Sequence, residues 1–523
     1  ATPEAQARTM QRRTFFRAAG AASAAVVVGR WFRGTSWAEP FGEAPPSAAS
    51  VMLPVERQAK RVLEIFLYGG LSPWETLYLV RGYGRPTDPM FANQQYYTFD
   101  FDGAGGTRSA LAACGFPAGT EIGQGFARDA LGVDVELGPF ARRLWMRPDV
   151  TARMRLLVQR HKLEPHEAAV PQALTGRPVG QPAAAGLGAH VQRYFLDRDP
   201  GDRAAPWSYV FATGGVAGDN VSAAAATGVH PGGARPLLVK IDNADSFADM
   251  LARDTVRGAG PVEPYDALMR TYIDAYGDRL RWKGEGDAVR SRRFADLTIA
   301  AGTVAKSDAI AGVLEPQLFT ARPGMACGDS RGRDIPGMSL EAARHLLTHP
   351  VQPARYVCVS DIGLYEASGG GGYDTHDANA ADTARNFDNL LRSLLAIINA
   401  PGESDPTKLS LDDTLIILNT EFGRTPWAQE RSDFGRNHHP YGYVTAMIGA
   451  TITAAEKGVY GAIGPDGRAE TAATPSENRI AALLSLGIWP FAPEAFAVSD
   501  VSGAVSEEDA AEKATARVLG VQL

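Results

Sequence analysis

A glycine run at 369–372 is followed by Tyr373, Asp374, Thr375 and His376, two of which could bind a metal ion. Side chains two residues apart in an extended segment point to the same side, so Asp374 and His376 can offer one carboxylate oxygen and one imidazole nitrogen to a divalent cation. The alternative is a flexible loop in which Asp374 only caps the helix that follows.

A second polar pair, Glu421 and Arg424, follows an apolar run that ends at Asn419. A carboxylate at the end of a strand can bind a cation, and the guanidinium of Arg424 offers paired donors suited to a phosphate or sulfate. The alternative is an ion pair between Glu421 and Arg424 that only fixes the loop. The two interpretations are compatible, because an arginine beside a metal ligand can orient that ligand.

Further candidates lie in two other loops. The adjacent residues His438 and His439 are expected to point in different directions, so that one serves a site and the other is packed or exposed. Glu75 follows the Gly69-Gly70 pair after the first apolar run, and it is a further candidate ligand. A plain turn explains that last stretch equally well.

The elements that must position these side chains alternate between short apolar runs and helical patterns. This alternation is typical of an α/β fold with a mainly parallel sheet and helices on both faces. The clearest helix is expected from Ala378 to Ile398, where apolar residues recur along one stripe. In such sheets ligands bind at the carboxyl ends of strands, so the polar residues after each strand are the candidates for chemistry. The expected strands are residues 62–68, 155–159, 237–241, 355–360, 414–419 and 443–448.

One domain is expected to span residues 61–523, after a linker at 39–60 that is rich in Pro, Ala and Ser. A long helical stretch without strand signals, at about 264–314, is predicted to be an insertion in this domain. Residues 84–140 and 180–235 are rich in Gly, Ala and Asp without clear periodicity, and we expect them to form long surface excursions.

The first 38 residues have the order of a twin-arginine signal peptide. Arg12 and Arg13 precede two phenylalanines, a short apolar run extends from Ala18 to Gly29, and small residues around Ala38 suit a cleavage site. This run falls short of the roughly 20 apolar residues that span a membrane, and no later stretch reaches that length. We therefore predict export to the periplasm or cell envelope, without a transmembrane helix in the mature chain.

Charge and cysteine content narrow the class of protein. The 52 Lys and Arg against 59 Asp and Glu give a net charge of −7, and removal of residues 1–38 makes the charge −12. This excess of negative charge argues against nucleic acid as a partner. Three cysteines, Cys114, Cys327 and Cys358, are few for a disulfide-stapled scaffold, and the odd number leaves at least one unpaired within the chain. Cys358 lies in an apolar run and is expected to be buried.

Several of these motifs together resemble a known family. The chain is similar to the twin-arginine-exported proteins grouped as domain of unknown function 1501, within the alkaline-phosphatase-like superfamily. The resemblance covers nearly the whole mature chain, and residues 421–426 are its most specific stretch. In chain order the matching motifs are Gly69-Gly70-Leu71-Ser72, the stretch from His166 to Arg177, Gly372-Tyr373-Asp374-Thr375-His376, Thr420-Glu421-Phe422-Gly423-Arg424-Thr425-Pro426 and Arg436-Asn437-His438.

The resemblance implies a doubly wound α/β fold in which Asp374, His376 and His438 are the three ligands of one metal ion. Glu421 is then a carboxylate of a second metal position, and Glu75 stays a further candidate ligand. The expected cofactor is a divalent ion, with zinc as the first choice and calcium or manganese as alternatives.

The catalytic candidates are Glu421, Arg424 and His166. Superfamily enzymes usually attack with a Ser or Thr at the helix start after the second strand, and this chain has no Ser, Thr or Cys between residue 160 and Thr175. Phe422 also stands where the superfamily has a histidine of its second metal position.

Two functions are compatible with this pattern. The first is an exported metal-dependent hydrolase of phosphate or sulfate esters, in which metal-activated water attacks a small anionic ester and Arg424 steadies it. The second is an exported binding or envelope-assembly protein that keeps the fold without the chemistry and contacts an envelope protein. The missing nucleophile motivates this second function.

Overall fold

The computed structural model describes residues 41–83, 106–198, 206–241, 323–364, 371–429 and 434–523, apart from short gaps within these ranges, together with a few residues between 264 and 314. The predicted signal peptide at 1–38 lies outside the described residues. Nearly all of the predicted insertion at 264–314 lies outside them as well.

The centre of the described structure is a sheet of eight strands in the order β14-β4-β13-β10-β1-β9-β5-β6. Strand β13 is antiparallel to both β4 and β10, and the other neighbouring pairs are parallel, so the sheet is mostly parallel. The strands are β1 (Arg61–Leu67), β4 (Met154–Gln159), β5 (Ser208–Ala212), β6 (Leu237–Lys240), β9 (Tyr356–Asp361), β10 (Thr414–Asn419), β13 (Tyr443–Ile448) and β14 (Gly458–Tyr460).

The six strands predicted from the sequence are all present, with ends that differ by at most one residue from those expected. The strongest predicted helix is α14 (Asn379–Ala396). These predictions succeed because strands buried on both faces appear in a sequence as short, nearly continuous apolar runs.

The prediction that residues 180–235 form a surface excursion is wrong. This region contains strand β5 and the helices α6 (Leu187–Arg198) and α7 (Gly215–Ala225). Strand β5 is buried along its whole length between β9 and β6. Strand β5 has only five residues, and α7 consists largely of small residues without a distinct apolar stripe. The sequence therefore gives only a weak indication of either element.

The described part of 84–140 is also structured. It contains helix α2 (Thr107–Ala113) and a hairpin of β2 (Gln124–Arg128) and β3 (Asp134–Leu137). Val135 and Leu137 on β3 are buried in the core, so this part of the predicted excursion is a packed hairpin.

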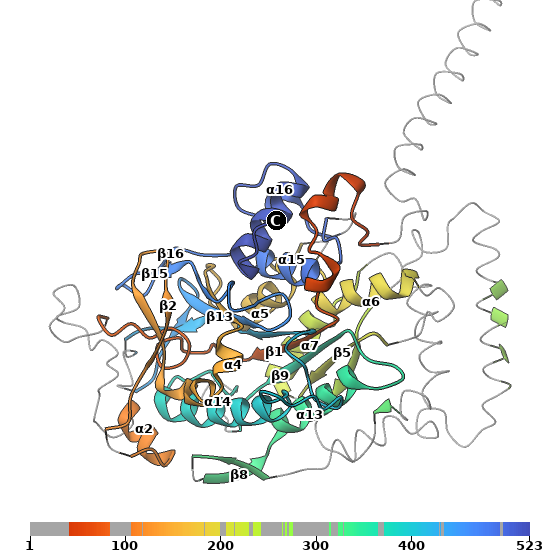
Figure 1. Ribbon diagram of the computed structural model, residues 1–523. Coiled ribbons are helices and arrows are strands. Elements are labelled where there is room, and N and C mark those ends of the chain that lie inside the picture. Colours follow the sequence, from red (N-terminus) through yellow and green to blue (C-terminus); the bar gives the residue numbers. More distant parts are fainter. Residues whose placement is uncertain are drawn as a thin grey trace, which may run out of the picture.

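Helices cover both faces of the sheet (Figure 1). One face carries α13 (Ile335–Thr348) and α14, and the other carries α5 (His166–Thr175), α15 (Pro475–Ser485) and α16 (Glu507–Ala514). The side chains of β1 alternate between the two faces. Leu63 and Ile65 pack in the hydrophobic core under α13 and α14, whereas Val62 and Phe66 pack in the core under α5, α15 and α16.

Residues 41–60 of the predicted linker are packed against the domain. The backbone N–H of Trp489 donates to the carbonyl of Gly42 at 2.7 Å, and Ala48 and Leu53 are buried. Among the helices that the structure describes, none combines the length and apolar character needed to cross a bilayer.

The three cysteines have separate roles. Cys114 and Cys327 form a disulfide, and Cys358 is a free, buried residue of β9 as predicted.

Four strand ends create the site. Because β4, β10, β1 and β9 run in the same direction, their carboxyl ends lie at one edge of the sheet. The loops that leave this edge carry His166, Glu421, Gly69 and Asp374, respectively.

Candidate metal centre

Asp374 and His376 lie in the loop between β9 and α14. This loop is held from both sides, because Tyr373 N donates to the carbonyl of Tyr68 and Arg436 N donates to the carbonyl of Thr375. Nε2 of His376 lies 3.0 Å from Oδ1 of Asp374, so the two side chains do point to the same point. No side chain caps α14 at its first turn, so the capping alternative for Asp374 does not hold.

His438 approaches Asp374 from a short antiparallel ladder. Strand β11 (Gly423–Arg424) pairs with β12 (His438–His439), and the ladder sets His438 opposite Arg424. Nε2 of His438 lies 3.2 Å from Oδ1 of Asp374 and 3.2 Å from Nε2 of His376. As expected for adjacent residues, His439 points elsewhere and contacts the carbonyl of Gly467.

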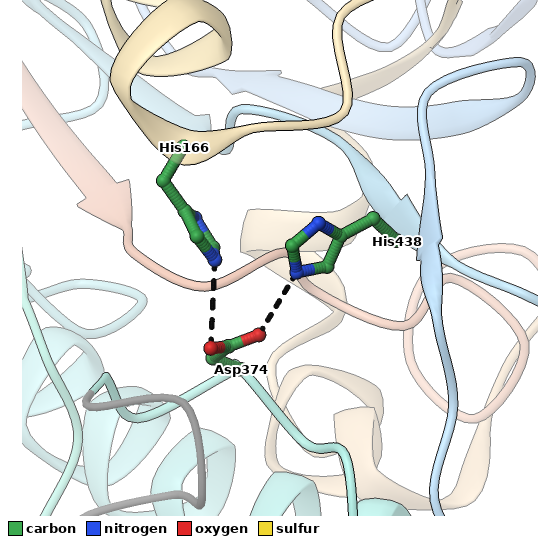
Figure 2. A group of neighbouring side chains, drawn as sticks. All are labelled: His166, Asp374 and His438. Atoms are coloured by element: carbon green, nitrogen blue, oxygen red, sulfur yellow. Dashed lines mark hydrogen bonds and ion pairs between the residues drawn. The ribbon is translucent and has the colours of Figure 1, made fainter. Parts of the chain in front are cut away.

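His166 is the first residue of α5, the helix that follows β4. Its Nε2 lies 3.4 Å from Oδ2 of Asp374. Figure 2 shows the rings of His166 and His438 next to each other, both pointing toward that carboxylate. Apart from this ion-pair contact with Asp374, Nε2 of His166 is buried without a hydrogen-bond partner among the described residues. His166, Asp374 and His438 offer ligand atoms that all lie within 4.8 Å of one another.

All three histidine rings are anchored through Nδ1. Nδ1 of His166 lies 2.9 Å from Oε1 of Glu421, Nδ1 of His376 lies 3.0 Å from Oε1 of Gln429, and Nδ1 of His438 lies 2.8 Å from the backbone carbonyl of Glu164. Each partner is an acceptor, so each Nδ1 carries the proton and donates it. Metal-binding histidines have the same arrangement, with the second ring nitrogen bonded to a carboxylate or carbonyl.

When the three rings are neutral and Nδ1 carries the proton, each Nε2 has a free lone pair. All three Nε2 atoms lie near the carboxylate of Asp374. Two lone pairs 3.2 Å apart, as on His376 and His438, repel each other unless a proton or a metal cation lies between them. Tetrahedral zinc with bonds of about 2.0–2.1 Å to nitrogen separates its ligands by about 3.3 Å. Nε2 of His376 and of His438 and Oδ1 of Asp374 lie 3.0 to 3.2 Å from one another, and Nε2 of His166 lies 3.4 Å from Oδ2 of Asp374. Asp374, His376 and His438 therefore fit a divalent ion, with His166 as a further nitrogen donor beside the second oxygen of Asp374.

Arg424 contacts the carboxylate of this group. Its Nη2 donates to Oδ1 of Asp374, while the side chain of Arg424 is 0% exposed. The alternative of a direct ion pair with Glu421 is not what the structure shows for Arg424. A buried guanidinium bonded to protein groups is placed to orient Asp374 rather than to reach a substrate.

Glu421 lies one step behind His166. Its Oε1 accepts from Nδ1 of His166 and from the backbone N–H of Gly69 at 2.7 Å. Its side chain is 0% exposed. This position fits a carboxylate that orients a ligand, and its assignment as a direct ligand stays a prediction.

Glu75 belongs to a separate buried network. The Ser72 hydroxyl and the Asn379 amide donate to its two carboxylate oxygens, and the Thr375 hydroxyl donates to Oδ1 of Asn379. The described contacts of Glu75 therefore reach the Asp374 loop through Asn379 and Thr375, and its assignment as a ligand also stays a prediction.

Charges within the group shift its titration. Burial lowers the pKa of His166, but Asp374 and Glu421 outweigh burial and raise this pKa to about 9. Burial would raise the pKa of Asp374, but the three histidines and Arg424 hold it well below its usual range. For His438, burial dominates and lowers the pKa. These shifts favour an ionised Asp374 carboxylate beside a protonated His166 at neutral pH.

Several residues that hold the histidine rings in place were not predicted from the sequence. The ring of His166 is stacked on Tyr68, with centroids 5.0 Å apart, and it also contacts Phe422 at 5.0 Å. Gln429 and the carbonyl of Glu164 were not predicted as anchors either. No sequence motif marks these partners.

The comparisons with known proteins are informative for one region. Residues 353–486 match the model of a family described as "Protein of unknown function (DUF1501)". This match supports the resemblance to that family, and it includes Asp374, His376, Glu421 and His438 of the site. No curated protein matches the chain.

Proposed function

We propose that this chain is an exported, metal-dependent hydrolase of phosphate or sulfate esters. The observation that carries the proposal is the geometry of His376 and His438. Their Nε2 atoms lie 3.2 Å apart and both Nδ1 atoms are held by acceptors, so in the neutral rings both Nε2 lone pairs can bind one cation. Asp374 supplies the negative charge that such a cation needs.

His166, His376, His438 and Asp374 would hold the ion. When bound, it would neutralise charge that develops on phosphoryl or sulfuryl oxygens and activate water as the attacking group. Nitrogen and carboxylate ligands suit zinc and also manganese, whereas calcium prefers oxygen ligands. The ligand set therefore favours zinc or manganese.

Neighbouring residues would orient the ligands of the ion, and part of the centre is accessible to a substrate. Glu421 holds the ring of His166 with Nε2 toward Asp374, and Arg424 fixes that carboxylate. The side chains of His376 and His438 are 30% and 20% exposed, so an ester can approach from their side.

Export is part of the proposal, and one structural feature supports it. The Cys114–Cys327 disulfide joins residues far apart in the chain. Disulfides persist mainly in oxidising compartments such as the periplasm, which agrees with the signal peptide predicted at 1–38.

Elemental analysis of the purified chain, paired with a screen of phosphate and sulfate esters, tests this function. We expect a bound divalent ion and ester hydrolysis that a chelator abolishes and the ion restores. His376→Ala should lose the activity, while His349→Ala, in the segment between α13 and β9, should keep it. Full activity in a metal-stripped sample would contradict the proposal.

A second function has one observation in its favour. His166, Asp374 and His438 offer ligand atoms within 4.8 Å of one another, and His376 also contacts Asp374. A set of four protein ligands is typical of structural rather than catalytic zinc. The chain would then be a catalytically inactive exported binding or envelope-assembly protein. In that case the ion would raise the unfolding temperature without any turnover of esters.

A further inference from the structure

We propose that Arg424 is the built-in second cation of the centre, and that it limits the chain to one divalent ion. This inference rests on the proposed function, because it presumes that Asp374 and the three histidines bind a metal. It concerns how many ions bind and which residue sets that number.

Arg424 is fixed by backbone carbonyls from three residues. Nε donates to Gly70 O at 3.3 Å, Nη1 donates to Arg436 O at 3.0 Å, and Nη2 donates to Gly69 O. Nη2 also donates to Asp374. A guanidinium keeps its charge in a protein, so these bonds hold a permanent positive charge at a fixed, fully buried position.

The carboxylates that a second ion would use are Asp374 and Glu421, and both lie beside this charge. Gly69 connects them, because its N–H donates to Glu421 while its carbonyl accepts from Arg424. Oε1 of Glu421 is further engaged by Nδ1 of His166. A second ion between the two carboxylates would have to displace a guanidinium that carbonyls hold in place.

Charge and ligand type also oppose a second ion. Two-metal sites hold their ions about 3.5–4 Å apart, and like charges repel strongly over such distances in a buried site. Phe422, which follows Glu421, offers no donor atom, and its ring is stacked on His438 with centroids 4.4 Å apart. Arg424 therefore places a positive charge beside the two carboxylates, and Phe422 adds no further ligand for a second ion.

The first experiment measures stoichiometry on the full chain. After removal of metal with a chelator, the chain is titrated with Zn²⁺ and with Mn²⁺ by calorimetry, and the loaded protein is analysed for its elements. We expect one ion per chain. Two ions per chain would overturn this inference while leaving the proposed function intact, whereas no bound ion would overturn both.

The second experiment removes the charge. Arg424→Gln is expected to bind a second, weaker Mn²⁺, visible as an exchange-coupled electron paramagnetic resonance signal, and Arg424→Gln/Glu421→Gln should return to one ion. Arg424→Lys keeps the charge and should bind one ion, with affinity reduced about 10-fold or more because the fork geometry is lost.

Arg177→Gln is the matched control, because Arg177 is a buried arginine that pairs with Asp500 away from the centre. It should bind one ion with unchanged affinity. A folded Arg424→Gln variant that still binds one ion would overturn the inference. If Arg424→Gln does not fold, the stoichiometries of the natural chain and of Arg424→Lys decide, since two ions in either would overturn it.

Discussion

Nδ1 of His166 and Oε1 of Glu421 lie 2.9 Å apart, although the two residues are separated by 255 positions in the chain. In the neutral ring the bond places the proton on Nδ1, and it turns Nε2 toward Asp374. A buried carboxylate behind a ligand histidine also raises the basicity of the ring. Under the proposed function, Glu421 would act on the ion through His166.

Glu421→Gln should weaken metal binding about 10-fold, because an outer partner of a ligand histidine contributes about 10- to 100-fold to affinity. The substitution keeps the size of the side chain and removes its charge. The apparent Kd for Zn²⁺ can be measured by competition with a chromophoric chelator.

Glu164→Gln is the control for that measurement. Glu164 accepts from His438 through its backbone carbonyl, whereas its carboxylate contacts the exposed Tyr441. Affinity should therefore be unchanged. An equal loss in both variants would mean that the effect of Glu421 is one of general charge rather than of its bond to His166.

Gly69→Ala should damage both the fold and the centre. Gly69 has a φ of +108°, and a Cβ there would lie 2.2 Å from the backbone nitrogen of Asp374. We expect a loss of roughly 2 kcal/mol or more in the free energy of unfolding from strain and displacement. Urea unfolding measures this loss, and the zinc affinity should fall as well.

Gly82→Ala is the matched control, because a Cβ at Gly82 meets no atom within 4 Å. Its free energy of unfolding should change by less than about 1 kcal/mol. If Gly69→Ala behaved like Gly82→Ala, the close contact between the first turn and the Asp374 loop would be refuted.

Much of the sheet could be predicted from the sequence, because central strands are short apolar runs followed by polar loops. Strand β5 was missed because its five residues lie among Ala- and Gly-rich segments that resemble loops. The small residues of α7 are suited to close packing on the sheet, yet they leave no distinct apolar stripe.

The sequence predicts a site residue when its side chain can bind a metal and it follows directly after a strand. Asp374 and His376 stand out because two metal-binding residues follow a strand with a spacing of two. The partner of Arg424 was not predictable, because its contact with Asp374 spans 50 positions and depends on how two loops pack. The role of His166 depends in the same way on where α5 begins relative to the loop after β9.

Asp361→Asn should change how stability depends on pH. Burial raises the pKa of Asp361 to about 7, although Gly363 N and the Tyr373 hydroxyl donate to its carboxyl. The folded state therefore favours the protonated form. This contribution to stability is fully present below about pH 4, and it is lost as the pH rises toward 7.

Asparagine is neutral at every pH, so the variant should gain stability relative to the natural chain by roughly 1–3 kcal/mol between pH 5 and pH 8. Urea unfolding of the metal-free proteins at both pH values measures the difference. If the free energy of unfolding changed equally in both proteins between pH 5 and pH 8, Asp361 would already be ionised in the folded state at pH 5.

Glu64→Gln should cost about 3–5 kcal/mol of unfolding free energy, because removing one partner of a buried ion pair leaves the other charge uncompensated. Oε1 of Glu64 on β1 lies 2.6 Å from Nη1 of Arg479 on α15, both side chains are at most 1% exposed, and the Tyr356 hydroxyl also donates to Glu64. Urea unfolding measures the cost.

Asp134→Asn is the control, because it breaks the exposed pair with Arg128 and should cost less than about 1 kcal/mol of unfolding free energy. Equal costs would show that the buried pair does not fasten α15 to the sheet.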